Sequence, residues 1–253
     1  MANMFKELKI LSDHGKQYVK DLRNQPVSER FRGRPVISAG ITASQIEKAS
    51  AVCPVNAIDR TTGAIDLGRC TFCNECALMI PEVYRFTNDY RIAANRREDL
   101  VIRPGQTGNI RIDEASVRKD VRRLFRRSLK LRQVSVGGDN SCEMELAASG
   151  NVNFDVGRYG IEFVASPRHA DGIVITGPVT ENMAEALEIC YAAVPAPRVI
   201  ILVGADAISS GIFEGSPALD RRFIETHTPD LYVPGNPAHP LTFINGVMDL
   251  LGI

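Results

Sequence analysis

Four of the six cysteines lie within a short stretch of this chain. Cys53 is followed by a proline, and Cys70, Cys73 and Cys76 recur at intervals of three residues. Three cysteines at this spacing on a tightly turning loop can direct their thiolates at one point, and a fourth from a distant segment completes the ligands of a [4Fe-4S] cluster. Zinc sites usually divide their ligands between two C-x2-C pairs. The spacing therefore favours one [4Fe-4S] cluster, with a zinc ion or four buried free thiols as alternatives.

The cysteine motif occurs twice in this chain, and neither copy has all of its cysteines. In a two-cluster ferredoxin the run C-x2-C-x2-C-x3-C-P occurs twice, and the fourth cysteine of each run binds the other cluster. Here the first run keeps only its fourth cysteine and the second run only its first three, and these four jointly serve a single cluster. We expect buried apolar side chains, including those on one face of a helix, in place of the second cluster. The positions without cysteine hold Ala43, Ile46 and Ala49 in the first run and Ile80 in the second.

The composition limits the classes of protein to which the chain can belong. Its 253 residues are 44% hydrophobic, which is enough for a buried core and excludes wholesale disorder. Thirty basic residues balance thirty acidic ones, so no general attraction to nucleic acid is expected. No stretch approaches the roughly 18 apolar residues of a membrane span, and the charged start has no apolar signal-peptide centre. We expect a cytoplasmic protein, in which cysteines bind metal or stay as thiols.

Two further segments accompany the cysteines. Strand patterns with turns follow each run, the sequence FRGRP occupies 31–35, and DYRIA at 89–93 precedes REDL at 97–100. In these features the chain resembles the ferredoxin-like iron–sulfur domains of membrane hydrogenases and respiratory complex I, over roughly residues 25 to 105. The resemblance implies an α+β ferredoxin-like domain that carries one [4Fe-4S] cluster.

The segment after this region is strongly basic. Val117, Val121, Leu124 and Leu131 recur at helical spacing, and residues 118–132 contain eight basic side chains against the single acid Asp120. We expect a helix with a cationic face. It is either a solvated surface helix or a docking element for an acidic partner subunit or anionic headgroups.

The second half alternates between strand and helix patterns. Apolar runs at 161–165, 172–176 and 198–204 are rich in Val and Ile, and Thr180 can cap a helix that extends to Ala193. Short apolar runs separated by a helix indicate a parallel sheet covered on both faces. Cys190 lies on the apolar stripe of that helix and is expected to be an inert core residue.

The loops of this half carry a second resemblance. Segments 136–145, 166–171, 176–180, 204–206, 211–213 and 233–237 resemble the cluster-bearing small subunit that formate hydrogenlyase-type [NiFe] hydrogenases share with complex I. The resemblance implies an α/β flavodoxin-like domain and a position on the cytoplasmic face of the membrane. It also implies partners, namely a large-subunit-like protein and membrane subunits. No dinucleotide fingerprint or phosphate-binding loop occurs, so no nucleotide cofactor is expected.

The resemblance fails at the ligands of the second-domain cluster. In the hydrogenase branch, the four cysteines of the cluster nearest the large subunit would fall at Asp139, Cys142, Asp206 and Asn236 of this chain. One thiolate, two carboxylates and an amide do not make an iron–sulfur site. We expect these side chains to hydrogen-bond one another and nearby backbone amides in a vestigial pocket, with a Mg²⁺ or Mn²⁺ site as the alternative.

The sequence thus predicts four regions with different roles. They are an amphipathic helix at 1–24, a ferredoxin-like domain at 25–110, a basic linker helix at 111–135 and the α/β domain at 136–253. The first hypothesis is an electron-transfer subunit of an oxidoreductase complex, without a complete active site of its own. The alternative is a structural adaptor in a hydrogenase-derived complex whose second domain has lost its redox role.

Overall fold

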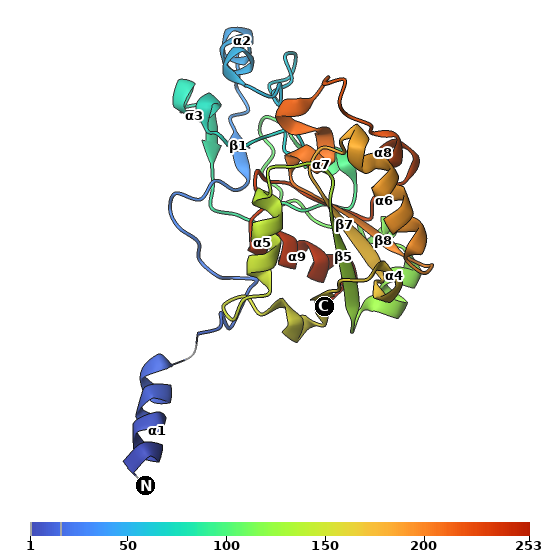
Figure 1. Cartoon of the computed structure of the whole chain (residues 1–253). Coiled ribbons are helices and arrows are strands. Elements are labelled where there is room, and N and C mark those ends of the chain that lie inside the picture. The colour runs from blue at the N-terminus through green and yellow to red at the C-terminus, as the bar shows by residue number, and fades with distance from the viewer. Residues whose placement is uncertain (1, 16) are drawn as a thin grey trace.

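The computed structural model describes residues 2–15 and 17–253 (Figure 1). Its largest element is a parallel sheet of five strands in the order β6-β5-β7-β8-β9. In chain order this is 2-1-3-4-5, the strand order of flavodoxin-like sheets. The strands are β5 Leu129–Ser135, β6 Ile161–Phe163, β7 Gly172–Thr176, β8 Val199–Val203 and β9 Leu231–Val233. All five residues of β7 and of β8 are buried, as expected where helices cover both faces of a parallel sheet.

Two groups of helices cover the sheet. Buried side chains of α4, α5 and α9 share one core with Val174 and Ile201 of the sheet, whereas those of α6, α7 and α8 share another with Ile175 and Leu202. The first group is α4 Lys119–Phe125, α5 Ser141–Ser149 and α9 Pro240–Leu251, and the second is α6 Glu181–Ala193, α7 Ala205–Ser209 and α8 Arg222–Thr226. Short 3₁₀ helices cover Arg97–Leu100, Glu114–Ser116, Val156–Tyr159, Pro167–His169 and Gly211–Phe213.

The first part of the chain holds two small antiparallel sheets and two helices. Strand β1 (Pro35–Ile37) pairs with β3 (Tyr84–Phe86), and β2 (Ile65–Asp66) pairs with β4 (Val101–Ile102). Helix α2 (Ala43–Val52) begins with a capping box, in which the Thr42 hydroxyl accepts from the Gln45 amide and the Gln45 side chain accepts from the Thr42 amide. Helix α3 (Glu75–Met79) follows the cysteine loop.

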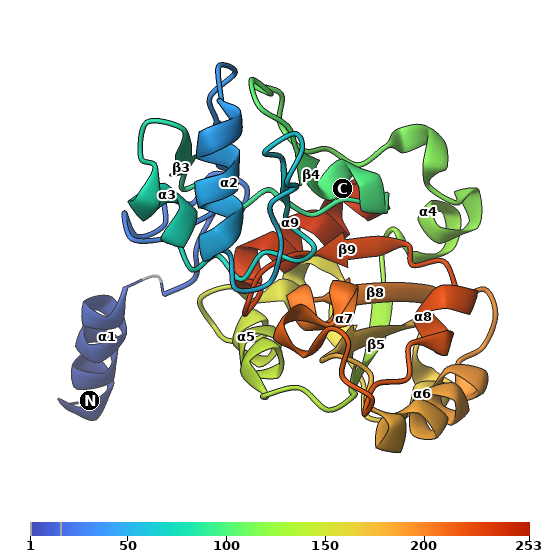
Figure 2. The same cartoon turned by 90° about the horizontal axis from the view of Figure 1, so that it is seen from above.

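This first part is joined to the edge of the parallel sheet. Ala94 and Tyr232 exchange two backbone hydrogen bonds of 2.8 and 3.0 Å, which adds one antiparallel bridge to β9. Both views show α2, α3 and β3 grouped at one end of the molecule (Figures 1 and 2). The bridge covers part of an edge strand and places the cysteine loop near the carboxyl end of β9.

The predicted elements of the second half are confirmed at 161–163, 172–176 and 199–203, and Thr180 is the residue before α6. The single basic helix predicted at 111–135 is wrong. Helix α4 covers only Lys119–Phe125, and Leu129–Ser135 is the central strand β5, so the sheet begins before residue 136. The alternation of Leu129, Lys130 and Leu131 has the period of two of a strand, and a basic side chain exposed between two buried leucines fits it.

The amphipathic helix predicted at 1–24 is shorter than expected. Helix α1 covers Ala2–His14 and projects from the rest of the molecule (Figure 1). Gly15 adopts a φ of 59°, the left-handed conformation that commonly ends helices. Met1 and Lys16 of the predicted segment lie outside the described residues. Farther on, Leu22 is fully buried against α9, where its carbonyl accepts a hydrogen bond from Asn245. In the described residues no helix has the length and hydropathy needed to cross a membrane.

Candidate functional site

Four cysteines from three segments line one small cavity. Cys53 is the residue that ends α2, Cys70 and Cys73 lie on the loop after β2, and Cys76 lies in α3. Cys70 and Cys76 are buried, Cys53 is half-buried and Cys73 is exposed. The structure therefore brings together all four predicted cluster ligands. The wall beside them is mostly apolar and includes Val55, Ala57, Ile58, Ile65 and Phe86.

Left-handed backbone turns the cysteine loop around this cavity. Phe72, between Cys70 and Cys73, has a φ of 54°, and Asn74, between Cys73 and Cys76, has a φ of 77°. Asparagine tolerates this conformation, but for a bulky residue such as phenylalanine it is unfavourable and needs support from its surroundings. Phe72 has this support, since its side chain is buried and its ring packs 5.9 Å from that of Phe86.

Backbone amides donate to the sulfur atoms. The Ala57 amide lies 3.2 Å from Cys53 Sγ, and the Phe72 amide lies 3.3 Å from Cys70 Sγ. Amide donors of this kind stabilise thiolates and set the reduction potential of an iron–sulfur cluster.

Burial makes the free thiols weak acids. It raises the pKa of Cys76 to about 11 and that of Cys70 further, and the neighbouring cysteines add to both effects. At neutral pH these groups are thiols, so a metal that binds them must displace protons. Within residues 2–15 and 17–253 no group of three or more His, Cys, Asp or Glu side chains is arranged for a single metal ion. A four-iron cube has a separate iron at each ligated corner. The four sulfur donors, amide donors and apolar walls fit such a cluster.

Apolar side chains occupy the positions at which the two cysteine runs lack cysteine. Ile46, Ala49 and Ile80 are buried, as expected. Ala43 is exposed, because it is the first residue of α2 and lies near the end of the helix, so the prediction that it joins the buried face is wrong. Tyr84 is fully buried in this region and donates to the Gly63 carbonyl at 3.0 Å.

The second predicted set lies at the carboxyl ends of the parallel strands. Cys142 is the buried second residue of α5, and Gly204 leaves room for its sulfur, since a Cβ there would lie 2.6 Å from Cys142 Sγ. Burial raises the pKa of Cys142 to about 11, and Asp139 and Asp206 are close enough to add to this effect. Asn236 lies on the loop after β9 and lines a different pocket from the four cysteines.

The expected hydrogen bonds among these side chains are not found in the described part of the chain. The expected bond to a nearby backbone amide is found: Asp139 accepts from the Ser141 hydroxyl at 2.6 Å and the Ser141 amide at 2.9 Å, which lowers the pKa of Asp139. Asp206 Oδ1 is buried without a hydrogen-bond partner in that part of the chain. Burial, then Asp139 and Glu143, raise the pKa of Asp206 to about 6. A single thiol among carboxylates does not fit an iron–sulfur cluster.

Glu143 belongs to this second site, although its position in the sequence does not single it out. It is buried, and one carboxylate oxygen accepts from the hydroxyls of Ser135 at 2.5 Å and Thr176 at 2.7 Å. The only available signal was a glutamate beside Cys142 on the helix that faces the sheet. Its two hydroxyl partners come from β5 and β7, which sequence spacing alone does not bring together.

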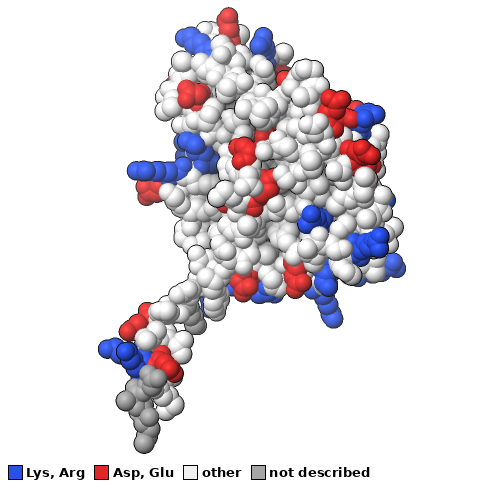
Figure 3. Space-filling model, viewed as in Figure 1, with Lys and Arg blue, Asp and Glu red and all other residues white. Residues whose placement is uncertain are grey.

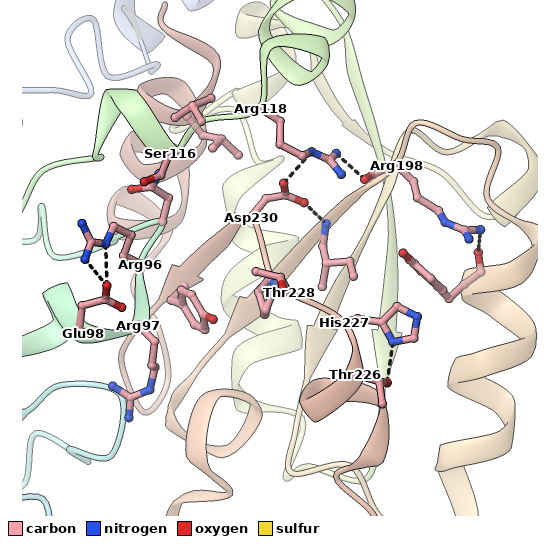
Figure 4. A pocket seen from close by; sticks show the side chains of 17 residues that line it. Arg96, Arg97, Glu98, Ser116, Arg118, Arg198, Thr226, His227, Thr228 and Asp230 are labelled. Atoms are coloured by element: carbon pink, nitrogen blue, oxygen red, sulfur yellow. Dashed lines mark hydrogen bonds and ion pairs between the residues drawn. The ribbon is translucent and has the colours of Figure 1, made fainter.

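A cavity of about 540 Å³ lies at the amino ends of β8 and β9 (Figure 4). Two arginines of its lining, Arg96 and Arg118, pair with the carboxylates of Glu98 and Asp230. Arg118 Nε lies 3.1 Å from Asp230 Oδ1 and a second Arg118 nitrogen donates to the Arg198 carbonyl, while Asp230 also accepts from the Ile200 amide. Acidic and basic side chains are likewise interspersed on the face shown in Figure 3.

The comparisons with known proteins concern the second half most closely. A protein-family model described as NADH ubiquinone oxidoreductase, 20 Kd subunit, matches residues 140–250. A probable membrane-bound hydrogenase subunit of Pyrococcus furiosus is 34% identical over 115 residues, which are 46% of this chain and 69% of that protein. Formate hydrogenlyase subunit 7 of Escherichia coli is 34% identical over 144 residues, 56% of each chain.

A solved archaeal complex was also matched in structure. A chain of the membrane-bound sulfane sulfur reductase, an archaeal respiratory membrane complex, is 24% identical with a TM-score of 0.44, over 50% of this chain and 70% of that chain. The family model and the hydrogenase relatives confirm the resemblance found in the loops of the second half. The chain therefore belongs to the family of the 20 Kd subunit of NADH ubiquinone oxidoreductase, which includes hydrogenase subunits.

Proposed function

We propose that this chain is an iron–sulfur electron-transfer subunit of a membrane-associated oxidoreductase complex of the hydrogenase or complex I type. It would carry one [4Fe-4S] cluster on Cys53, Cys70, Cys73 and Cys76, in a ferredoxin-like first domain. The observation that carries the proposal is the convergence of these four thiols on one cavity, with amide donors to the sulfurs. The relatives that are named as hydrogenase subunits support the assignment to a complex.

The cluster would supply one-electron chemistry, and the protein would control its environment. The four cysteines would bind iron, the apolar wall would limit access of water, and the amides of Ala57 and Phe72 would stabilise charge on the sulfurs. The exposed Cys73 marks the side of the site that is nearest to solvent. By family membership the partners would be a large-subunit-like protein and membrane subunits, with this chain peripheral on the cytoplasmic face. No complete active site is proposed on this chain.

A structural adaptor is the second candidate, and the second site favours it. Asp139, Asp206 and Asn236 stand where the hydrogenase branch would have thiolates, and one Asp206 oxygen has no partner in the described chain. An electron on the first cluster would then have no second cluster within this chain to receive it. The remaining cluster would stabilise the first domain or regulate assembly.

Anaerobic purification followed by iron, zinc and sulfide analysis tests the cluster itself. We expect about four irons and four sulfides per chain, with little zinc. Cys53→Ser and Cys76→Ser should each lose most of the iron. Cys190→Ser is the matched control, since Cys190 lies on α6 away from the cavity, and it should keep the full iron content.

A redox titration followed by EPR separates the two candidates. A reversible signal in the ferredoxin range of potential supports electron transfer. A cluster that cannot be reduced, and whose loss only destabilises the protein, supports the adaptor. Eight irons would contradict the assignment of the second site as vestigial, and one zinc per chain without sulfide would overturn the proposed cluster.

A further inference from the structure

A further pocket, lined by Asn236 of the vestigial set but by none of the four cluster cysteines, lies between the two parts of the chain. It has a volume of about 180 Å³ and is bounded by the cysteine loop, the loop after β9 and the start of α9. Ligands of parallel sheets bind beyond the carboxyl ends of the strands, and small-molecule sites favour the junctions between domains. Its position therefore meets both general expectations for a binding site.

The polar side chains that line this pocket can all donate hydrogen bonds, although Asn236, Thr71 and Thr242 can also accept them. Arg30, Arg32, Asn236, His239 and Thr242 line it, and no aspartate or glutamate does. Among the ion pairs found in residues 2–15 and 17–253, none involves the guanidinium group of Arg30 or Arg32. Two exposed arginines that make no ion pair in the described residues can bind an anion, and the planar guanidinium suits a carboxylate.

The deep side of the pocket adds two more donors. Thr242 is only 1% exposed, and its hydroxyl has no hydrogen bond among the described residues. His239 Nδ1 accepts from the Leu241 amide at 3.1 Å, so the proton of the neutral ring is on Nε2 and is free to be donated. Burial lowers the pKa of His239 and favours this neutral form. The pocket also lies at the N-terminus of the 12-residue helix α9, whose dipole favours an anion.

Apolar side chains form the rest of the lining. Phe31, Phe72 and Ile92 border the pocket, and the ring of Phe31 packs edge-on against His239 at 5.1 Å. A bare inorganic ion would leave this surface without a partner, whereas an organic body would cover it. The volume suits a ligand of about ten non-hydrogen atoms, smaller than the usual drug-sized ligand.

We propose that this pocket binds a small organic carboxylate, with the carboxylate at Arg30 and Arg32 and the organic body against Phe31 and Phe72. Arginine forks hold the two oxygens, and the Thr242 hydroxyl and His239 Nε2 complete the donor set. The proposal does not depend on the [4Fe-4S] cluster, since none of the four cysteines lines the pocket.

The binding of 4-fluorobenzoate to the full chain, followed by ¹⁹F NMR and calorimetry, tests the proposal. We expect saturable binding of one ligand per chain. The double variant Arg30→Ala/Arg32→Ala should weaken it by about tenfold or more, and Thr242→Val by about fivefold. Arg85→Ala is the control, because Arg85 is exposed on β3 outside the pocket, and it should leave the affinity unchanged.

Two probes separate the parts of the ligand. 4-Fluorotoluene lacks the carboxylate and inorganic phosphate lacks the apolar ring, so both should bind more weakly than 4-fluorobenzoate. Equal affinity for either probe would overturn the assignment to an organic carboxylate. Absence of saturable binding at millimolar concentration, or unchanged affinity in both the double variant and Thr242→Val, would overturn the site.

Discussion

The pKa values of two aspartates of the vestigial site are shifted in opposite directions. Asp139 is exposed and accepts hydrogen bonds from Ser141, which lower its pKa. Asp206 is half-buried, faces Asp139 and Glu143, and has its pKa raised to about 6. A raised pKa means that the folded state holds the proton more tightly than the unfolded chain. Asp206 therefore favours the folded state most below its unfolded pKa of 3.8, and this contribution is lost as the pH rises through 6.

Replacing Asp206 by asparagine should stabilise the protein at pH 7. The amide carries no charge to desolvate, and screening of this half-buried group limits the gain in free energy of unfolding to about 1 kcal/mol. Thermal unfolding should show a melting temperature raised by about 2–4 °C at pH 7. The advantage over the wild type should shrink as the pH falls from 6 to 4.

Asp139→Asn is the matched control, with the opposite sign. The folded pKa of Asp139 is lowered, so its contribution to stability is present above the unfolded pKa and is lost as the pH falls. The asparagine variant should melt lower than the wild type at pH 7. Equal melting curves of the Asp206 variant and the wild type at pH 7 would contradict the raised pKa.

At the scale of secondary structure, the predictions from sequence were correct in segments where a single pattern of residues dominated. Strands β7 and β8 are continuous apolar runs, and the spacing of Cys70, Cys73 and Cys76 predicted a shared cavity that the structure contains. The prediction of a helix was wrong around β5, because the basic residues of this segment obscured the change from a helical period to a period of two. The donor-lined pocket was not predicted either, since it unites segments separated by about 200 residues of chain.

The buried apolar side chains of α2 lead to a prediction about the stability of this helix in the fold. Ile46 is buried, and it lies close enough to Gly63 that a Cβ there would come within 3.1 Å of it. Ile46→Ala would remove buried methyl groups and leave a cavity, so we expect the free energy of unfolding to fall by about 2–4 kcal/mol. Urea unfolding of the intact protein measures this.

Ala43→Ser is the control for Ile46→Ala. Ala43 is exposed at the start of the same helix, so its substitution should change the stability by less than about 0.5 kcal/mol. An equal effect of the two substitutions would show that α2 does not pack as described.

For the whole molecule, the two parts of the chain share one core. Buried Leu67 and Leu100 of the first part belong to the same cluster of contacts as Ile173 and Ile200 of the parallel sheet. The backbone bridge between Ala94 and Tyr232 and the hydrogen bond from Ser209 to the Gly68 carbonyl at 2.8 Å add polar links. A core that spans both parts couples their unfolding.

We therefore expect the protein to unfold in one transition. With the cluster bound, its visible absorption and the far-ultraviolet ellipticity of the parallel sheet should be lost together on heating, because the cysteine cavity and the sheet rest on the same core. Removal of iron by a chelator should lower the melting temperature of the sheet as well, since metal that binds only the folded state stabilises everything coupled to it. Bleaching of the cluster in a separate transition, with ellipticity and melting temperature of the sheet unchanged, would show that the two parts fold independently and that the shared contacts contribute little.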